Sequence, residues 1–213
     1  MLKLAVFDFD STLMDGETLE FLAEEFGLRE KIAAITAEAM NGKIDFFESL
    51  IKRVALLKGL EQNKVEKICA ELPLMKGARE TISELKQAGF KTVCFSGGFK
   101  SATAPARKIL GLDADFSNDL HFKYGKLTGL VGGEMMFSSS KGTMLQTLQR
   151  LLSITEKNTV AVGDGANDLS MFKFAGTRVA FCAKDVLKKA ANVIVEEKNL
   201  TCALDGIFKN FNS

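Results

Sequence analysis

Two aspartates stand two positions apart where an apolar run of the sequence ends. The run Leu2–Phe9 is typical of a buried β-strand, and Asp8 and Asp10 lie at its carboxyl end. A lone aspartate in such a place is usually a turn former or a helix cap. At period two, however, both carboxyl groups lie on the same face of a strand that stays extended. The other strand ends decide between these interpretations.

A second acidic pair follows another apolar run. The segment TVAVGDGANDLSMF places Asp164, Asn167 and Asp168 directly after Thr159–Val162. Taken alone, a cluster of Asp, Asn and Gly is equally well explained as a turn. In a parallel sheet, however, the carboxyl ends of strands meet, so four carboxylates would come together. Their repulsion requires a cation, and because Cys and His ligands are lacking, the oxygen ligands favour Mg²⁺.

Groups suited to an anion occur at two further places. The segment FSGGF contains Ser96 and Gly97 after an apolar run, and SSSKGT contains Lys141 before a helical pattern. A hydroxyl, free backbone N–H groups and a helix N-terminus can bind phosphate. Separately, SGG is explained by a plain turn and Lys141 by a solvated surface lysine. Together they are suited to a phosphate ester held beside Mg²⁺ and attacked by a carboxylate.

The elements that must position these residues alternate between strands and helices. Near-continuous apolar runs predict strands buried on both faces, which is typical of a parallel sheet. The predicted strands are Leu2–Phe9, Lys91–Phe95, Thr159–Val162, Arg178–Phe181 and Val193–Val195. Helices are predicted at Thr81–Ala88, which ends before Gly89, and around the periodic apolar residues from Met144 to Leu152. This pattern predicts a doubly wound, Rossmann-like α/β fold.

The connection after the first strand is too long for an ordinary crossover. About 55 residues between Thr18 and Leu72 carry helical stripes and no convincing strand. The stripes include Leu19, Leu22, Ala23 and Phe26; Ile32, Ile35, Thr36 and Ala39; and Val65, Ile68, Cys69 and Leu72, with a further helix capped by Asp45. We therefore expect a small helical bundle that covers the carboxyl end of the first strand.

A further change of pattern occurs between Asp119 and Phe137. Period-two character on both sides of Tyr124, Gly125 and Lys126 predicts a small antiparallel hairpin inserted in the core.

Composition excludes several classes of partner. The chain of 213 residues has a formal net charge of +1, and no basic cluster or long apolar run predicts binding to nucleic acid or membrane. No secretory signal pattern is present at the N-terminus, so a cytoplasmic protein is expected. The four cysteines have no Cys-x-x-Cys spacing and are expected to be reduced thiols in or near the core. The single histidine, His121, leaves no histidine-based metal site or triad.

Taken together, the motifs resemble those of the haloacid dehalogenase (HAD) superfamily. They are DFDST from Asp8, Ser96 in SGG, Lys141 in KG and GDGAND from Gly163. The resemblance covers residues 4 to about 183, and the helical insertion resembles the superfamily's C1-type cap. It implies a HAD-like core of residues 1–14 and 76–213, a helical-bundle cap of residues 15–75, and a Mg²⁺-dependent phosphoric monoester hydrolase.

The resemblance also implies roles for the motif residues. Asp8 would be the nucleophile that forms an aspartyl-phosphate, and Asp10 the general acid that later acts as a base. Mg²⁺ would be held by Asp8, Asp164 and the backbone carbonyl of Asp10. The groups expected around the phosphate are Ser96, Gly97, Lys141 and Asn167, with Asp168 supporting the site by orienting Lys141.

Two charged residues in the predicted cap bear on the substrate. Arg53 shares a helical stripe with Phe46, and such an arginine usually packs only its stem, although its planar fork also suits a carboxylate. Glu17 could merely favour the helix dipole, or it could meet an ammonium group. The resemblance assigns both residues to the amino-acid end of O-phospho-L-serine and adds Met40 and Phe46 as apolar walls.

The activity implied by the resemblance is hydrolysis of O-phospho-L-serine to L-serine and phosphate, the last step of serine biosynthesis. One alternative is a related phosphatase or phosphotransferase acting on another small phosphomonoester, such as phosphothreonine. Another is a signalling receiver that is phosphorylated on Asp8 without turnover, although a receiver would be shorter and would need neither Asp10 nor a cap. The oligomeric state is left open between monomer and homodimer.

Overall fold

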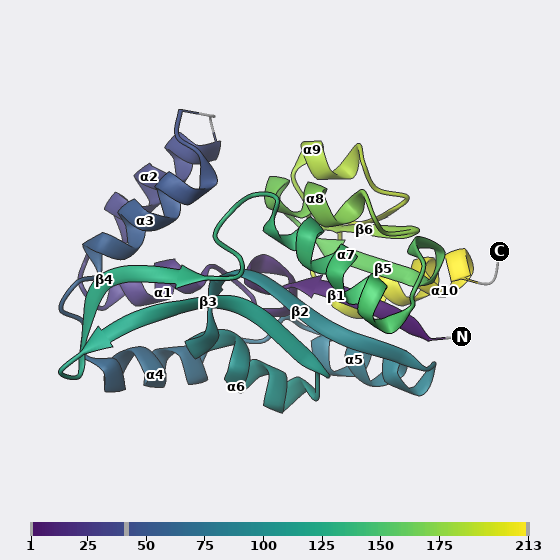
Figure 1. The fold of residues 1–213 in the computed structure, drawn as a ribbon, viewed down its shortest axis with the longest axis horizontal. Coiled ribbons are helices and arrows are strands. Elements are labelled where there is room, and N and C mark those ends of the chain that lie inside the picture. The colour runs from purple at the N-terminus through teal and green to yellow at the C-terminus, as the bar shows by residue number, and fades with distance from the viewer. Residues whose placement is uncertain (1, 41–42, 212–213) are drawn as a thin grey trace.

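Seven strands form one sheet in the computed structural model, which describes residues 2–40 and 43–211 (Figure 1). The strand order is β4-β3-β2-β1-β5-β6-β7, and each neighbouring pair is parallel except β3 and β4. The strands are β1 (Lys3–Asp8), β2 (Phe90–Phe99), β3 (Ala114–Lys123), β4 (Lys126–Gly133), β5 (Thr159–Gly163), β6 (Thr177–Phe181) and β7 (Val193–Val195). The predicted doubly wound α/β fold is confirmed.

Helices cover both faces of this sheet, which explains why its central strands are almost wholly apolar. In β1, Ala5 and Phe7 belong to one hydrophobic core, while Leu4 and Val6 belong to the other. The first core is completed by α5 (Ala78–Gln87), α6 (Lys100–Leu110) and α10 (Leu204–Phe211). The second is completed by α7 (Ser140–Leu152), α8 (Leu169–Phe172) and α9 (Asp185–Lys188). Short 3₁₀ turns cover Glu156–Asn158, Ala166–Asp168 and Leu200–Ala203.

Four helices between β1 and α5 form the insertion, which we call the cap. They are α1 (Thr18–Glu24), α2 (Arg29–Met40), α3 (Phe46–Leu56) and α4 (Gln62–Ala70). Figure 1 shows α2 and α3 rising away from the sheet edge, while α4 packs against α6 of the core. The Asp45 side chain caps α3 by accepting a hydrogen bond from the N–H of Glu48 (2.7 Å). The division at residues 15 and 75 stays a prediction.

The chain enters and leaves the cap through two segments that lie side by side. The N–H of Asp15 donates to the carbonyl of Pro73, and the N–H of Met75 donates to the carbonyl of Leu13, both at 2.9 Å. An exposed ion pair joins Asp15 to Lys198 of the core. These contacts hold the base of the cap beside β1.

Burial in the cap differs from the predicted stripes at several positions. Of the stripe predicted on α2, Ile32 is buried, whereas Ile35 and Thr36 are only partly covered. Phe26, predicted to pack with α1, is 41% exposed because the chain has already left that helix. Helical period alone therefore overstated how much of these helices faces the core.

The predicted hairpin is present, but it is not a separate insertion. β3 and β4 are antiparallel and are joined at Tyr124 and Gly125, both with positive φ. β3 begins earlier than expected, at Ala114, and its first part pairs in parallel with β2. This part contains the buried polar residues Asp115 and Ser117, which interrupted the apolar pattern from which strands were predicted. The hairpin thus extends the core sheet.

Two of the four cysteines were placed wrongly. All four are free thiols, and Cys69 and Cys94 are buried as expected. Cys182 and Cys202 are exposed, so they are not core residues. Cys182 directly follows β6 and has a φ of 44°, so the chain turns there and carries the side chain outwards. Within the described residues, no helix is both long and apolar enough to cross a bilayer.

Candidate active site

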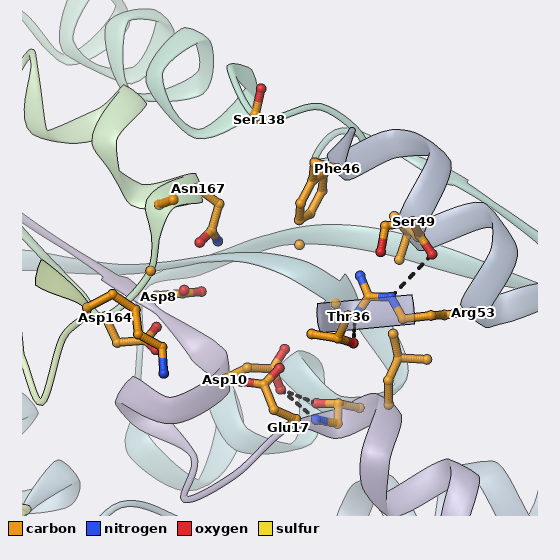
Figure 2. Close-up of a pocket in the computed structure, with 18 residues that line it drawn as sticks. Asp8, Asp10, Glu17, Thr36, Phe46, Ser49, Arg53, Ser138, Asp164 and Asn167 are labelled. Atoms are coloured by element: carbon orange, nitrogen blue, oxygen red, sulfur yellow. Dashed lines mark hydrogen bonds between the residues drawn. The ribbon is translucent and has the colours of Figure 1, made fainter. Parts of the chain in front are cut away.

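A cavity of about 290 Å³ lies between the carboxyl edge of the sheet and the cap (Figure 2). β1, β2 and β5 are neighbours in the sheet, so the residues that end them meet there. The sequence-predicted residues that line the cavity are Asp8, Asp10, Glu17, Phe46, Arg53, Gly97, Asp164 and Asn167. Predicted residues from four separate stretches of sequence are thereby brought together.

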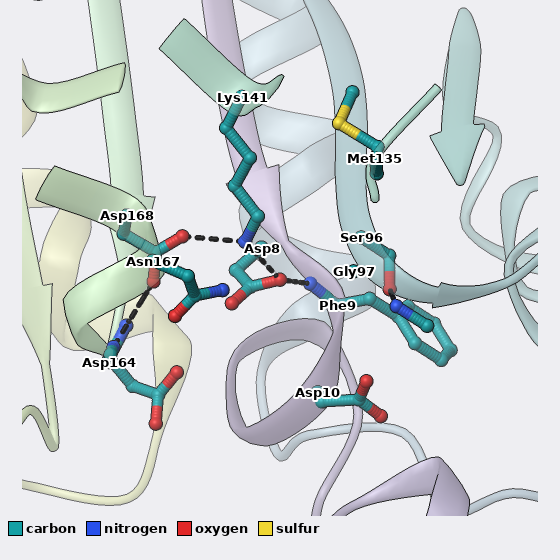
Figure 3. A network of polar contacts seen from close by, with 12 residues as sticks. Asp8, Phe9, Asp10, Ser96, Gly97, Met135, Lys141, Asp164, Asn167 and Asp168 are labelled. Atoms are coloured by element: carbon teal, nitrogen blue, oxygen red, sulfur yellow. Dashed lines mark hydrogen bonds and ion pairs between the residues drawn. The ribbon is translucent and has the colours of Figure 1, made fainter. Parts of the chain in front are cut away.

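Beneath this cavity, a buried lysine joins two carboxylates (Figure 3). The Nζ of Lys141, on the first turn of α7, lies 2.7 Å from Oδ1 of Asp8 and 2.6 Å from Oδ1 of Asp168. Burial alone would lower the pKa of Lys141, but Asp168 and Asp8 raise it above its ordinary value. The ammonium group therefore stays charged, and Asp8 also accepts a hydrogen bond from the N–H of Phe9 (2.6 Å).

Asp168 is held by its own hydrogen bonds. Its Oδ1 accepts from Lys141, while its Oδ2 accepts from the backbone N–H groups of Asp164 and Gly165, both at 3.1 Å. Gly163 leaves room for this carboxylate, since a Cβ there would lie 2.3 Å from Asp168 Oδ2. Asp168 is therefore placed to orient Lys141, and its catalytic role stays a prediction.

Three carboxylates at this edge are suited to a metal ion. One oxygen from each of Asp8, Asp164 and Asp168 can be chosen so that all lie within 4.8 Å of one another. Burial raises the pKa of Asp164 from 3.8 to about 8, with repulsion from Asp8 and Asp168 adding to the effect. A hard divalent cation would remove that repulsion. Both oxygens of Asp168 already accept hydrogen bonds, whereas Lys141 and the N–H of Phe9 both contact Oδ1 of Asp8. Asp8 and Asp164 are therefore the carboxylates better placed as ligands.

The backbone conformation that places Asp10 in the cavity differs from the predicted extended strand. β1 ends at Asp8, and the chain then makes a tight turn over Phe9–Leu13, with Ser11 at a φ of 57°. The assumption that the strand stays extended is therefore wrong. Asp10 is held instead by Thr18, whose N–H (2.8 Å) and hydroxyl (2.6 Å) both donate to its Oδ1.

The protonation of Asp10 reflects two opposing effects. Burial raises its pKa from 3.8 to about 6, and the negative charge of Asp8 acts in the same direction. The two hydrogen bonds from Thr18 oppose this rise because they favour the ionised form. Asp10 can therefore gain or lose a proton near neutral pH, as an acid–base group must.

The SGG segment is an irregular part of a strand rather than a turn. β2 continues to Phe99, with a shift of its register against β3 between Phe95 and Phe99, and α6 begins at the next residue. Ser96 is fully buried, and its hydroxyl accepts a hydrogen bond from the N–H of Gly98 (2.9 Å). A Cβ on Gly97 would lie 2.7 Å from the ring of Phe46. The cap thus contacts the core directly at this glycine.

The cap supplies one acidic and one basic group to the cavity (Figure 2). Glu17 accepts a hydrogen bond from the hydroxyl of Ser11 (2.9 Å), and burial followed by repulsion from Asp10 raises its pKa from 4.5 to about 8. Arg53 donates from Nε to the carbonyl of Ser49 (3.2 Å) and from Nη1 to the hydroxyl of Thr36 (3.4 Å). The side chain of Met40, predicted as a cavity wall, lies outside the described part of the chain.

Several polar lining residues were not predicted. Thr18, Thr36, Ser49 and Ser138 all line the cavity. Thr36 was the polar member of a predicted apolar stripe, and that signal could have identified it. Thr18 and Ser138 reach the cavity only because the turn after β1 and the loop before α7 fold against it, so nothing local in the sequence marks them.

Comparison with known proteins gives a consistent result. Residues 2–176 match the family of hydrolases described as haloacid dehalogenase-like hydrolase. A phosphoserine phosphatase of Wolinella succinogenes is 65% identical over 199 residues, which cover 93% of this chain and 97% of the relative. A solved phospho-aspartyl intermediate analogue of phosphoserine phosphatase is 48% identical with a TM-score of 0.91, and covers 96% of this chain and 98% of its own.

A substrate-bound phosphoserine phosphatase complex is equally similar, with 47% identity, a TM-score of 0.92, and coverage of 97% of this chain and 98% of its own. These matches extend through the cap as well as the core. The resemblance inferred from four short motifs is thereby confirmed over nearly the whole chain, and the chain belongs to the haloacid dehalogenase-like hydrolases.

Proposed function

We propose that this protein is a phosphatase that hydrolyses O-phospho-L-serine to L-serine and phosphate, the last step of L-serine biosynthesis. The main observation that supports this substrate is that Glu17 and Arg53 line the same cavity as Asp8. A carboxylate and a guanidinium above a phosphate site are complementary to a zwitterionic amino acid that carries a phosphate ester. The named activity of the similar proteins supports the same substrate.

In the first step, a carboxylate oxygen of Asp8 attacks phosphorus and the bond from phosphorus to the serine oxygen breaks. Asp10 donates its proton to the departing oxygen, so that serine leaves as a neutral alcohol. The product on the enzyme is an aspartyl-phosphate. Lys141, Ser96 and the N–H groups beside Gly97 would hold the phosphate oxygens, with Asn167 close by.

In the second step, water attacks the aspartyl-phosphate. Asp10, now ionised, accepts a proton from that water, and the bond from Asp8 to phosphorus breaks to release inorganic phosphate. Because Asp10 must be protonated first and ionised afterwards, a pKa raised to about 6 suits both steps. Thr18 keeps the carboxylate in place for both transfers.

The residues present fit a magnesium ion. Asp8, Asp164 and the backbone carbonyl of Asp10 would hold it, and hard oxygen ligands are those that Mg²⁺ prefers. When bound, Mg²⁺ offsets the repulsion between the phosphate and Asp8. Asp168 contributes by keeping Lys141 beside Asp8.

At the amino-acid end, Arg53 binds the substrate carboxylate and Glu17 binds its ammonium group. Burial and repulsion from Asp10 raise the pKa of Glu17 to about 8, and the positive charge of Arg53 opposes this rise only in part. A substrate ammonium group would supply further positive charge. Phe46 forms an apolar wall between the substrate and solvent. The same proposal places the enzyme in the cytoplasm as a monomer or homodimer.

The decisive experiment is a rate comparison over phosphate esters with and without chelator. We expect catalytic phosphate release that is fastest with O-phospho-L-serine, is lost in excess chelator and returns with Mg²⁺. A faster rate with phosphothreonine or transfer to an added alcohol would favour the related activities. Release of one equivalent of the alcohol per protein, with the phosphoryl group retained on Asp8 and no further turnover, would favour a receiver and would exclude the proposed enzyme.

A further inference from the structure

The boundary between the cap and the core is closed by backbone hydrogen bonds at one end of α3. The N–H of Gly59 donates to the carbonyl of Leu127, the N–H of Leu127 donates to the carbonyl of Leu60, and the N–H of Gln62 donates to the carbonyl of Gly125, each at 2.8 Å. These bonds join the connection between α3 and α4 to the β3–β4 hairpin. Separation there would break several backbone hydrogen bonds at once.

At the N-terminal end of α3, side chains alone close the boundary. The ring of Phe46 lies against Gly97. The next residue, Phe47, stacks on Phe137 of the loop between β4 and α7, with ring centroids 5.1 Å apart and planes 10° from parallel. Within the described residues, no hydrogen bond or ion pair is found between the first turn of α3 and this loop. The two ends of the helix are therefore attached with very different strengths.

The rings of Phe47 and Phe137 shield each other from water at an otherwise exposed place. Phe47 is 39% exposed and Phe137 is 58% exposed, although both are large apolar side chains. Neither belongs to a hydrophobic core of the described residues. Stacking removes part of both ring surfaces from water, and it also gains from ring geometry.

On the core side, Phe137 belongs to a segment beside the cavity that is fixed by hydrogen bonds. The N–H of Phe137 donates to the hydroxyl of Ser140 (3.1 Å), and the N–H of Ser140 donates to the carbonyl of Phe137 (3.0 Å). Ser138 lines the cavity, and Lys141 follows on α7. On the cap side, Phe47 shares a helix with Arg53. The stack thus connects the substrate-facing helix of the cap to the turn that precedes the buried lysine.

We propose that the stack of Phe47 on Phe137 is a latch that holds the cap closed, and that substrate enters between the N-terminal end of α3 and residues 134–139. The bonded end of α3 serves as the pivot, since it cannot separate without losing backbone hydrogen bonds. Phe47 and Phe137 are then positioning residues: they act through Phe46 and Arg53 by setting the fraction of molecules whose cavity is closed. Rings without a hydrogen bond can part and meet again in every turnover.

The latch predicts a specific kinetic signature. Phe47→Ala and Phe137→Ala should each raise KM for O-phospho-L-serine by about two- to tenfold, because a smaller closed fraction weakens apparent binding. The kcat should change by less than about twofold, since bound substrate still holds the cap closed. The double variant should behave like either single variant, because both remove the same contact. Phe137→Tyr, which keeps a ring, should retain the parent KM.

Phe26→Ala is the matched control. Phe26 is a cap phenylalanine of similar exposure, 41%, and no ring contact is found for it in the described part of the chain. It should leave KM unchanged. Equal KM effects of all three alanine variants, or additive effects in the Phe47 and Phe137 double variant, would overturn the latch.

A fluorescence measurement tests the latch without reliance on the substrate. The chain contains no tryptophan, so Phe47→Trp introduces a single reporter at the stack. We expect acrylamide to quench it more strongly once Phe137→Ala is added, whereas a Phe26→Trp reporter should not respond to that change. In an Asp8→Asn background, O-phospho-L-serine with Mg²⁺ should protect the Phe47→Trp reporter.

Only the kinetic test and the substrate-protection test rest on the proposed function. If O-phospho-L-serine is not the substrate, the response of acrylamide quenching to Phe137→Ala still reports on the stack. Quenching that is the same with and without the Phe137 ring would show that the stack does not form in solution, and would overturn the inference even if the phosphatase activity is as proposed.

Discussion

The core side and the cap side of the cavity hold their charged side chains in different ways. On the core side, Asp8, Lys141 and Asp168 are nearly or fully buried and are fixed by short contacts to one another and to backbone N–H groups. On the cap side, the Glu17 carboxylate accepts a hydrogen bond from Ser11, and the Arg53 guanidinium donates two longer ones. The proposed catalytic groups therefore lie on well-fixed parts of the core, and the proposed substrate-recognition groups lie on a less constrained insertion.

Fixed side chains suit phosphoryl transfer, and less constrained side chains suit entry and release of the substrate. Phosphoryl transfer requires attacking and departing atoms to be aligned closely, so its groups gain from fixed positions. A cavity that must admit and release a whole amino acid requires a wall that moves. Changes on the core side should therefore affect every ester alike, while changes on the cap side should separate one ester from another.

The largest loss of activity is expected from a substitution on the core side of the cavity. Asp8→Asn removes the nucleophile and should lower kcat by about 10⁵-fold or more for every phosphate ester. Phosphate release measured with O-phospho-L-serine and with an aryl phosphate checks this. Asp15→Asn, an aspartate outside the cavity, is the control and should retain most activity. Substantial turnover by Asp8→Asn would refute the nucleophilic role.

The second-largest loss of activity should depend on the leaving group of the phosphate ester. Asp10→Asn should lower kcat for O-phospho-L-serine by about 10²- to 10⁴-fold because the serine oxygen needs a proton to leave. An aryl oxygen leaves without one, so an aryl phosphate should still phosphorylate Asp8 and should show a burst followed by slow turnover. Rapid-quench kinetics separates the two phases. Full turnover of O-phospho-L-serine by this variant would refute the acid–base role.

The pH dependence of the unmodified enzyme sharpens this prediction. Asp10 must be protonated for phosphoryl transfer, so that step should slow as the pH rises through the pKa of Asp10, which burial raises to about 6. Hydrolysis of the aspartyl-phosphate needs ionised Asp10 and should slow as the pH falls through the same range. Single-turnover rates for both steps check the opposite signs, and parallel pH profiles would contradict the assignment.

A smaller but selective effect is expected from the cap. Arg53→Ala should lower kcat/KM for O-phospho-L-serine by about 10- to 100-fold, because it removes a charge-assisted contact to the carboxylate. The same variant should change kcat/KM for an aryl phosphate by less than about threefold. Lys52→Ala, the exposed neighbour on α3, is the control. Equal losses on both esters would exclude carboxylate recognition by Arg53.

The smallest effect tests how the cap holds its own side chains. Thr36→Val keeps the shape but removes the hydroxyl that accepts from Arg53 at 3.4 Å, so KM for O-phospho-L-serine should rise by about two- to fivefold. The aryl phosphate should be unaffected. Adding Thr36→Val to Arg53→Ala should have no further effect, since the hydroxyl acts through the arginine; a further loss would point to a direct contact with substrate.

The amino-acid sequence by itself determined the fold class, the order of the elements and most of the acidic and basic residues at the cavity. Apolar runs buried on both faces can form only a covered sheet, and a parallel sheet gathers the residues that end its neighbouring strands. Asp8, Asp164 and Gly97 could thus be assigned to one site without coordinates, because their positions follow from local pattern and topology.

Only the tertiary structure decided how the remaining groups are held. The strand does not stay extended to Asp10; a left-handed residue at Ser11 and two hydrogen bonds from Thr18 place that carboxyl group. The stack of Phe47 on Phe137 joins residues 90 positions apart in the sequence. Such contacts depend on how separate elements meet, and no local period or motif encodes them. The raised pKa of Asp10 has the same origin, because burial is a property of the assembled cavity.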